Sequence, residues 1–277
     1  MATGEDESEH SDQRHISWRV AILSDPHGDL VALQKVLSDL EALKPVDEVL
    51  VGGDLAQGGA QPAEVVDLIR ERGWLAVRGN GDDLLVRLAD GSAPADALRP
   101  AAATHGTLPE SVASHALWSV DRLGSERIEY LRTLPLSIVR GPFHFGSVVL
   151  VHATPWSTED VVLPDADEAV AQRIIGDAGA RLLLYGHIHT QYVRRVGDTT
   201  LMSVGAINGS NDADSRPTYA IVDLSDTITV QPRRVDWHLD ERLDAYAAAG
   251  VERRFSRDAP GPFPVRCQPG VALTAWP

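Results

Sequence analysis

Residues 182–189 read Leu-Leu-Leu-Tyr-Gly-His-Ile-His, and this stretch decides how the rest of the chain is interpreted. A run of large apolar residues without alternation is typical of a short strand covered on both faces, and Gly186 marks its end. His187 and His189 follow at a spacing of i, i+2, which in extended backbone places both imidazoles on one side. Imidazole is a common metal ligand, so the pair predicts a site for one ion or two adjacent ions. A His-x-His pair alone is more often structural or exposed, so its meaning depends on the other strands.

Four earlier apolar runs end in the same way. They lie at residues 20–23, 48–51, 74–77 and 147–151, and each is followed by a turn that carries polar side chains. Together with the first stretch they present Asp25, His27, Asp54, Asn80, His152, His187 and His189. Charged groups at buried strand ends are costly unless they are paired or metal-bound, so the seven predict a metal site rather than scattered loop residues.

Helical periodicity connects the first three of these runs. Apolar residues recur at helical spacing in residues 30–40 and 63–72, which predicts βαβ units with parallel strands. In open α/β sheets, ligands collect at the carboxyl ends of the strands. We therefore expect an α/β fold with the polar side chains gathered at one edge.

The chain divides into three predicted parts. Residues 1–17 are acidic and polar, typical of a disordered tail, and the domain is predicted at residues 18–237. Within it, an Ala-rich, Pro-punctuated segment at about 84–135 predicts a helical insertion. Residues 238–277 are predicted to form a C-terminal helix and a Pro-rich tail.

Some local features are predicted as well. Ser125 is expected to start a helix inside the insertion. A strand at residues 137–139 is expected to end in a turn at Gly141 and Pro142. Residues 192–235 have hairpin-spaced strand patterns, which predicts mixed or antiparallel pairing in this part.

Composition restricts the compartment and the partners. The 277 residues carry a formal net charge of −15, and no basic stripe with interleaved aromatics is present, so non-specific nucleic-acid binding is not expected. The single cysteine, Cys267, fits a reducing compartment. Neither an export signal nor an apolar run of about 20 residues is found, so we expect a cytoplasmic protein without a membrane span. A phosphate substrate stays compatible with the acidic charge if bound cations reverse the local field.

The motifs resemble those of the calcineurin-like metallophosphoesterases, in particular the small bacterial and archaeal phosphodiesterases. The matching segments, in the family's order, are Asp25-Pro26-His27, Gly53-Asp54, Gly79-Asn80-Gly81-Asp82, Val151-His152 and Gly186-His187-Ile188-His189. The resemblance covers about residues 18–235. It implies a four-layer αββα sandwich of two mixed sheets, with a helical insertion.

The resemblance also implies roles for the seven residues. One metal ion would be held by Asp25, His27, Asp54 and His189. The second would be held by Asp54, Asn80, His152 and His187, with Asp54 bridging the two ions. The nucleophile would be a metal-bridging hydroxide that attacks phosphorus in line, and Asp54, Asn80 and His152 are assigned to catalysis. Oxygen and imidazole ligands suit two divalent ions of Mn, Fe, Zn, Co or Ni, among which Mn or Fe is favoured.

One departure from the family pattern bears on the substrate. Family members with Gly-Asn-His use that His near the leaving group, but Gly81 stands here and has no side chain. A small phosphodiester is therefore favoured as substrate. Asp82 is expected either to support a ligand residue or to cap the next helix, and Arg78 either to contact phosphate or to pair with Asp82 or Asp83.

Three alternatives remain from the sequence. The same fold and metals could serve a phosphomonoesterase or a dinucleoside polyphosphate hydrolase. A non-catalytic metal-binding scaffold is less favoured, because all seven matching positions carry ligand-type side chains.

Overall fold

The computed structural model of the chain describes residues 17–92, 110–143, 146–212, 214, 216–225, 227–237 and 239–251. Most of the predicted acidic tail, part of the predicted insertion (93–109) and the Pro-rich tail with Cys267 lie outside the described residues. The strands are β1 (Trp18–Leu23), β2 (Glu48–Val51), β3 (Leu75–Ala76), β4 (Ser137–Phe143), β5 (Gly146–Val151), β6 (Leu182–Tyr185), β7 (Tyr192–Val196), β8 (Thr199–Ser203), β9 (Thr218–Leu224) and β10 (Ile228–Arg234). The helices are α1 (Leu30–Glu41), α2 (Pro62–Glu71), α3 (Asn80–Ala89), α4 (Glu110–Thr133), α5 (Glu168–Ala178) and α6 (Leu239–Ala249).

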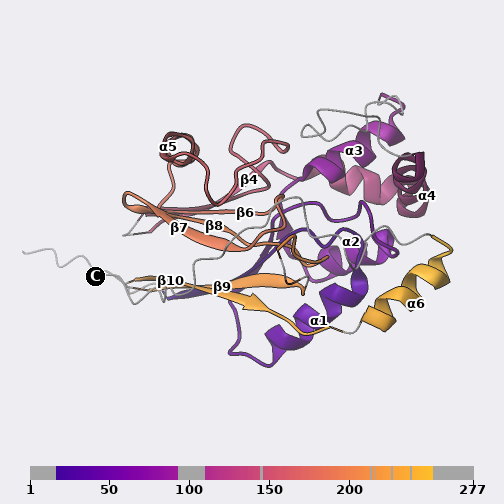
Figure 1. Cartoon of the computed structure of the whole chain (residues 1–277), viewed down its shortest axis with the longest axis horizontal. Coiled ribbons are helices and arrows are strands. Elements are labelled where there is room, and N and C mark those ends of the chain that lie inside the picture. The colour runs from indigo at the N-terminus through magenta and orange to yellow at the C-terminus, as the bar shows by residue number, and fades with distance from the viewer. Residues whose placement is uncertain are drawn as a thin grey trace, which may run out of the picture.

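The strands form two five-stranded sheets that face each other (Figure 1). Sheet A has the order β10-β9-β1-β2-β3, and sheet B has the order β4-β5-β6-β8-β7. Strands β1, β2 and β3 are parallel, whereas β9 runs antiparallel to β1 and to β10. In sheet B, β6 is parallel to β5 and β8, and the outer strands β4 and β7 are antiparallel. Both sheets are mixed, as predicted.

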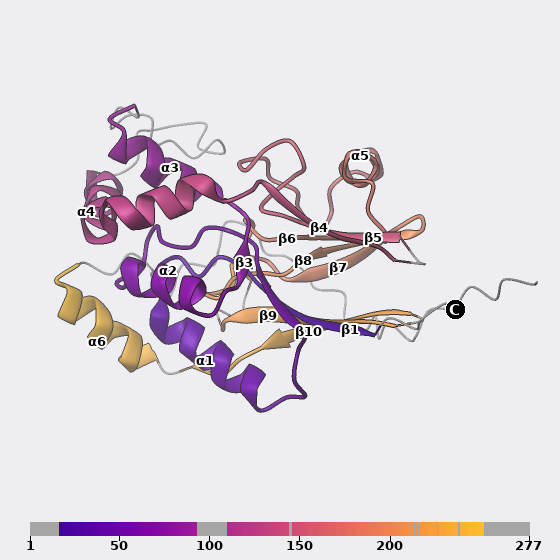
Figure 2. The same ribbon diagram turned by 180° about the vertical axis from the view of Figure 1, so that it is seen from behind.

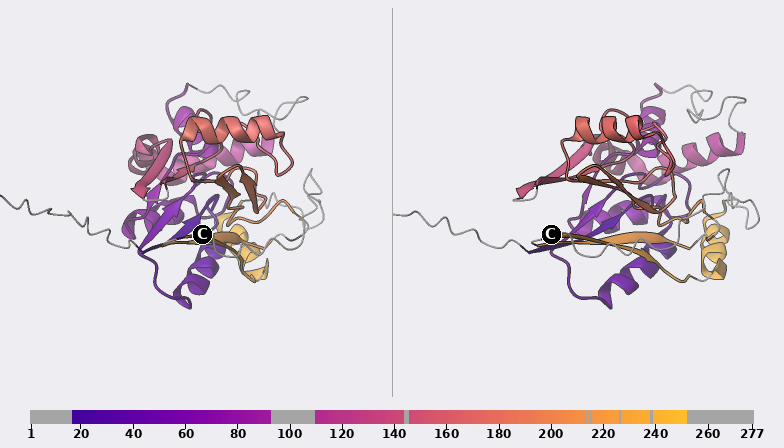
Figure 3. Two further views of the ribbon diagram at one scale, coloured as in Figure 1. Left: turned by 90° about the vertical axis from the view of Figure 1, so that its left-hand side faces the viewer. Right: turned by 60° about the vertical axis from the view of Figure 1, so that its left-hand side comes forward.

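Alternation along the strands produces the layers. In β1, Val20 and Ile22 belong to the apolar core between the sheets, together with Leu150 and Leu182 of sheet B. Ala21 of the same strand belongs to a second core with side chains of α1 to α4. A third core joins the far face of sheet B to α5, and Figures 2 and 3 show α1 and α5 on opposite outer faces. The predicted four-layer sandwich is confirmed.

The expected helix start at Ser125 is confirmed, because α4 is interrupted at Gly124, whose φ of 66° and ψ of 174° are not helical, and its second segment follows directly. Two local expectations differ from the structure. The expected turn at Gly141 and Pro142 is wrong, because β4 continues to Phe143 and absorbs the irregularity as a register shift against β5. Helix α3 begins at Asn80 itself, before the predicted start of the insertion. Among the described residues, no helix is long and apolar enough to cross a membrane.

Candidate metal centre

All seven residues predicted from the strand ends come together in the structure. Asp25 and His27 follow β1, Asp54 follows β2, and His152 follows β5, while His187 and His189 follow β6. Asn80 is the first residue of α3, just after β3. These five strands come from both sheets, so the cluster lies where the carboxyl ends of their parallel strands meet.

Asp25, His27 and His189 form one side of the cluster, which we call the first half. The Nε2 atoms of His27 and His189 are 3.0 Å apart, and His189 Nε2 is 3.3 Å from Asp25 Oδ1. Asp25 is fully buried, whereas the His27 and His189 side chains are 12% and 16% exposed. Three ligand atoms therefore surround one point that is open to solvent.

Asn80, His152 and His187 form the other side, which we call the second half. Asn80 Oδ1 lies 2.9 Å from His152 Nε2 and 3.0 Å from His187 Nδ1. Asp54 stands between the halves, because its Oδ2 is 3.5 Å from His27 Nε2 and its Oδ1 is 3.6 Å from His152 Nε2. Each half therefore has one oxygen of the same carboxylate.

These separations fit divalent metal ions. Ligands bound tetrahedrally at about 2.1 Å lie about 3.4 Å from one another. The first-half atoms, with Asp54 Oδ2, are separated by 3.0–3.8 Å. Two sets of three residues each offer ligand atoms that lie within 4.8 Å of one another. They are Asp25, His27 and His189, and Asp25, Asp54 and His152, so Asp25 belongs to both sets. The donor set contains imidazole, carboxylate and amide groups, which suits first-row transition metals.

The backbone at these residues is unusual. In the part of the chain that is described, the non-glycine residues with positive φ are Asp25, His27, Asp54, His187 and His189. The φ values lie between 48° and 63°, in the left-handed region. The expectation of extended backbone at His187 and His189 is therefore wrong, because their φ values are 63° and 54°. Strained backbone of this kind persists where the surroundings hold it, and it clusters at functional sites.

Glycines next to the seven residues allow the loops to approach closely. A Cβ at Gly186 would lie 2.0 Å from Ser24 Oγ and 2.2 Å from Asp25 Oδ2. A Cβ at Gly79 would lie 2.1 Å from Asp54 Oδ1. No L side chain fits such contacts, so these glycines are required for the segments to meet.

Main-chain carbonyls set the orientation of two imidazoles. His27 Nδ1 lies 2.6 Å from Gln57 O, and His152 Nδ1 lies 2.7 Å from Gly52 O. A carbonyl can only accept, so both Nδ1 atoms carry a proton, and in the neutral form of each ring Nε2 presents its lone pair to the cluster. No pattern in the sequence identifies these two carbonyls in advance, because every residue type has a main-chain carbonyl.

Asp25 is held by its neighbours in a similar way. Its Oδ2 accepts from Ser24 Oγ at 2.5 Å and from the amide of His187 at 3.1 Å. Ser24 was missed from the sequence, although it directly precedes the first ligand-type residue. The second bond joins the loop after β1 to the loop after β6.

Burial and charge shift the pKa values in this cluster. Burial lowers the pKa of His27, and burial together with His152 lowers that of His187 to about 4. The pKa of His152 is raised, because the Asp54 and Asp25 carboxylates outweigh the effect of its burial. Burial would raise the pKa of Asp25, but His189 outweighs it and holds the pKa well below its usual range. Neutral His27 and His187 are in the protonation state that binds metals.

The structure shows which groups Asp82 and Arg78 contact. The Asp82 carboxylate accepts from the amides of Gly79 at 3.0 Å and Leu55 at 2.9 Å, so it joins the start of α3 to the residue after Asp54. Burial and Asp54 raise the pKa of Asp82 to about 7. Arg78 Nε pairs with Asp83 at 2.8 Å, and another of its nitrogens donates to Arg132 O.

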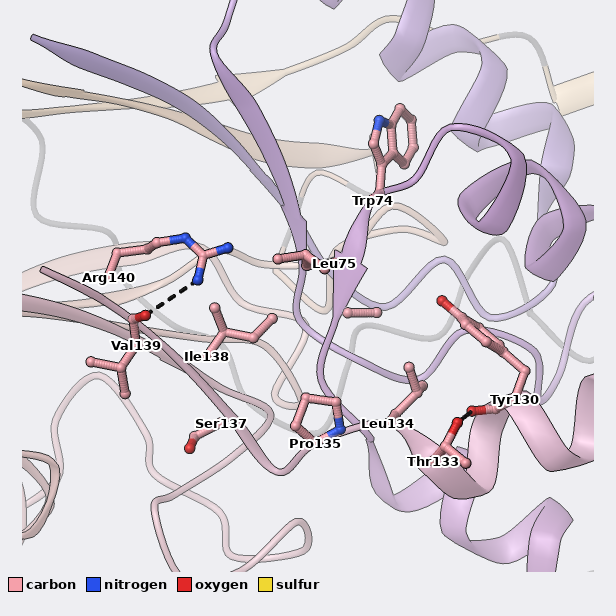
Figure 4. Close-up of a pocket in the computed structure, with 11 residues that line it drawn as sticks. Trp74, Leu75, Tyr130, Thr133, Leu134, Pro135, Ser137, Ile138, Val139 and Arg140 are labelled. Atoms are coloured by element: carbon pink, nitrogen blue, oxygen red, sulfur yellow. Dashed lines mark hydrogen bonds between the residues drawn. The ribbon is translucent and has the colours of Figure 1, made fainter.

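A surface pocket elsewhere is not part of this centre (Figure 4). It lies between β3, the end of α4 and β4, with Trp74, Tyr130 and Arg140 among its lining residues. None of the seven residues lines it. The candidate site is therefore the cluster of seven residues at the strand ends.

Comparison with known proteins agrees with the fold and the motifs. The chain is 28% identical over 190 residues to the uncharacterized protein MJ0912 of Methanocaldococcus jannaschii. These aligned residues make up 68% of this chain and 69% of the relative. A metallophosphoesterase structure from Sphaerobacter thermophilus has a TM-score of 0.64 at 24% identity, covering 85% of this chain and 95% of that one. The hypothetical protein PH1004 of Pyrococcus horikoshii has a TM-score of 0.71 at 20% identity, covering 84% and 94%.

The sequence also matches a family model over residues 18–227, which is most of the described domain. The model is that of the calcineurin-like phosphoesterase superfamily domain. The chain therefore belongs to the calcineurin-like phosphoesterase superfamily.

Proposed function

We propose that this protein hydrolyses small phosphodiesters with two divalent transition-metal ions, one in each half of the centre. The observation that carries the proposal is the position of Asp54, whose two oxygens face His27 and His152 at 3.5 and 3.6 Å. A carboxylate whose two oxygens face two separate groups of potential ligands is well placed to bridge two ions. The superfamily itself is one of phosphoesterases.

The residues of the chain would hold the ions and set the field around them. Asp25, His27 and His189 would bind the first ion, and Asn80, His152 and His187 the second, with Asp54 shared. When bound, two such cations neutralise charge on phosphate oxygens and lower the pKa of a water molecule. The fixed Nδ1 protons of His27 and His152 would keep both imidazoles oriented without further rearrangement.

The diester preference is supported by position 81. The amide of Gly81 donates to Asp54 Oδ1 at 2.7 Å, and glycine offers no side chain that could protonate a leaving group. A diester with a leaving group of low pKa needs such a proton less than a monoester with a poor leaving group does. Mn or Fe is our proposed metal, and a small phosphoester in a reducing cytoplasm is the proposed context.

Metal analysis and a substrate panel test the proposal together. We expect two ions per chain, and with Mn²⁺ faster hydrolysis of bis(p-nitrophenyl) phosphate than of p-nitrophenyl phosphate or a dinucleoside polyphosphate. Asp54→Ala should lower the rate by at least about a thousandfold, or about 4 kcal/mol. Asp198→Ala is the control, because that side chain is 82% exposed in a turn.

The possible results separate the alternatives. Faster hydrolysis of the monoester or of the polyphosphate would refute the diester preference and leave the hydrolase assignment standing. Two bound ions without turnover of any substrate in the panel would instead indicate a metal-binding scaffold. Absence of bound ions would remove the proposed function altogether.

A further inference from the structure

The C-terminal helix α6 lies beyond residues 18–227, which match the family model, yet it contacts the loops of the metal centre. Figures 1 and 2 show α6 beside α1, on the side of sheet A that carries the helices. Its side chain Arg242 is only 4% exposed. Burying a charged guanidinium is costly unless the group is paired with an opposite charge or hydrogen-bonded.

Arg242 binds the loop that carries His27. Its Nε is 2.5 Å from Asp29 Oδ2, and the Asp29 side chain is 2% exposed. The other Asp29 oxygen accepts from the amide of Ala32 at 3.0 Å and caps α1. The rings of Trp237 and Tyr246 flank the guanidinium, with centroids at 4.9 and 5.9 Å.

The same helix also reaches the loop after β2. Tyr246 is 3% exposed, and its hydroxyl donates to Gly58 O at 3.3 Å. The preceding carbonyl, that of Gln57, is the one that orients the His27 ring at 2.6 Å. Helix α6 therefore contacts both segments that determine where His27 lies.

His27 needs this support more than an ordinary loop residue does. Its φ is 48°, in the left-handed region, and its amide donates to Asp54 O at 2.8 Å. The next residue, Gly28, donates to Leu55 O at 2.8 Å, which ties the loop after β1 to the loop after β2. A strained conformation persists only where the surrounding contacts hold it.

We propose that Arg242 is a positioning residue that, through Asp29, holds the strained loop of His27 in place and so sets the metal affinity of the first half. This inference rests on the proposed two-ion centre. Groups that support a metal ligand typically change metal affinity by about 10- to 100-fold when removed. The contacts of Arg242 and Tyr246 described above go to the loops after β1 and β2 and not to Asn80, His152 or His187, so the affinity of the second half should not change.

Site-resolved metal titration tests the proposal. Asn80→Ala leaves one ion in the first half, and His189→Ala leaves one ion in the second half. In the Asn80→Ala background, Arg242→Met should weaken Mn²⁺ binding by at least about tenfold in calorimetry. In the His189→Ala background, the same substitution should leave the affinity within about twofold, a contrast that a general loss of stability would not produce.

A matched control removes another ion pair between the same helices. Lys35 on α1 pairs with Glu241 on α6 at 2.9 Å, but the two side chains are 30% and 50% exposed. Lys35→Met should leave both affinities unchanged. If Arg242→Met does not fold, Arg242→Lys, which keeps the charge and loses the planar fork, should show a smaller weakening in the same half.

Equal affinities of the Arg242 variants and their backgrounds in the first half would overturn the proposal, and so would equal weakening in both halves. Failure of the proposed two-ion centre is recognised separately, because the unsubstituted protein would then bind fewer than two ions, and failure of the proposed hydrolysis is recognised by the substrate panel.

Discussion

The two halves of the candidate metal centre differ in the charge of their side chains. The first half contains the Asp25 carboxylate, whereas Asn80 supplies a neutral amide to the second, and Asp54 serves both. The first half is also supported by α6 and by the Ser24 hydroxyl. Since a fixed carboxylate attracts a divalent cation more strongly than an amide does, the halves should differ in affinity. If the proposed two ions bind, we expect the first half to hold its ion more firmly than the second.

Removing the charge that distinguishes the halves should give the largest effect. Asp25→Asn is expected to weaken Mn²⁺ binding in the first half by at least about 100-fold, more than loss of a supporting group, because a ligand itself is changed. Calorimetry in the Asn80→Ala background measures this affinity. An effect below about tenfold would contradict the assignment of Asp25 as a ligand.

A chelator titration of the unsubstituted protein should release the two ions in separate steps. We expect the second half to lose its ion at a chelator concentration about tenfold lower than the first half does. This tenfold difference corresponds to about 1.4 kcal/mol of binding free energy. In Asn80→Asp both halves have a carboxylate of their own, so the two steps should merge. A single step in the unsubstituted protein would show that the halves do not differ.

The contact between the halves can be disturbed through Gly186. An added Cβ would lie within 2.2 Å of Asp25 Oδ2 and Ser24 Oγ, and so Gly186→Ala should lower the free energy of unfolding by about 1–3 kcal/mol, by analogy with overpacked cores. Urea unfolding measures this change. Gly176→Ala is the control, because a Cβ there meets nothing within 4 Å, and it should stabilise helix α5 by about 0.5–1 kcal/mol.

The smallest expected effect on stability comes from a carboxylate far from the candidate centre, and this effect should depend on pH. Asp39 on α1 accepts from Arg233 at 2.9 Å and from Tyr219 at 2.6 Å. Burial alone would raise the pKa of Asp39, but these hydrogen bonds lower it. Its stabilisation is therefore present above the unfolded pKa of about 3.9 and is lost as the pH falls through the lower folded value.

Asp39→Asn should accordingly lower the free energy of unfolding by less than about 1 kcal/mol at pH 7, because the Arg233 and Asp39 side chains are 31% and 28% exposed and solvent screens the pair. The difference from the unsubstituted protein should disappear in strong acid, as measured by thermal unfolding at several pH values. The pH at which the ions leave should stay the same in both proteins. A shift in that pH would show that the halves respond to distant charges.

Much of the fold and the centre could be predicted because both depend on strand ends. Apolar runs such as residues 182–185 are recognisable, and parallel pairing brings their carboxyl ends to one edge. The side chains that follow are then neighbours, whatever the loop conformation. That is why the seven residues could be selected although the assumed extended backbone of His187 and His189 was wrong.

The parts that escaped prediction depend on contacts between distant segments. Nothing local in the sequence shows that Arg242 lies next to Asp29, more than 200 residues away, or that a carbonyl orients His152. The Gly141-Pro142 pair resembles a turn locally, yet pairing with β5 keeps the segment extended. Such features follow from tertiary packing, which overrides local preference.

The left-handed backbone at His27, His187 and His189 limits which residues can replace them at no steric cost in relatives of this chain. Glycine would adopt these dihedral angles without steric penalty, so the loops do not require histidine for their shape. A relative with glycine at the equivalent positions would keep the same turns and give up the imidazoles. We therefore expect the residue types at these three positions to distinguish relatives that can hold the proposed ions from relatives that cannot, independently of overall similarity.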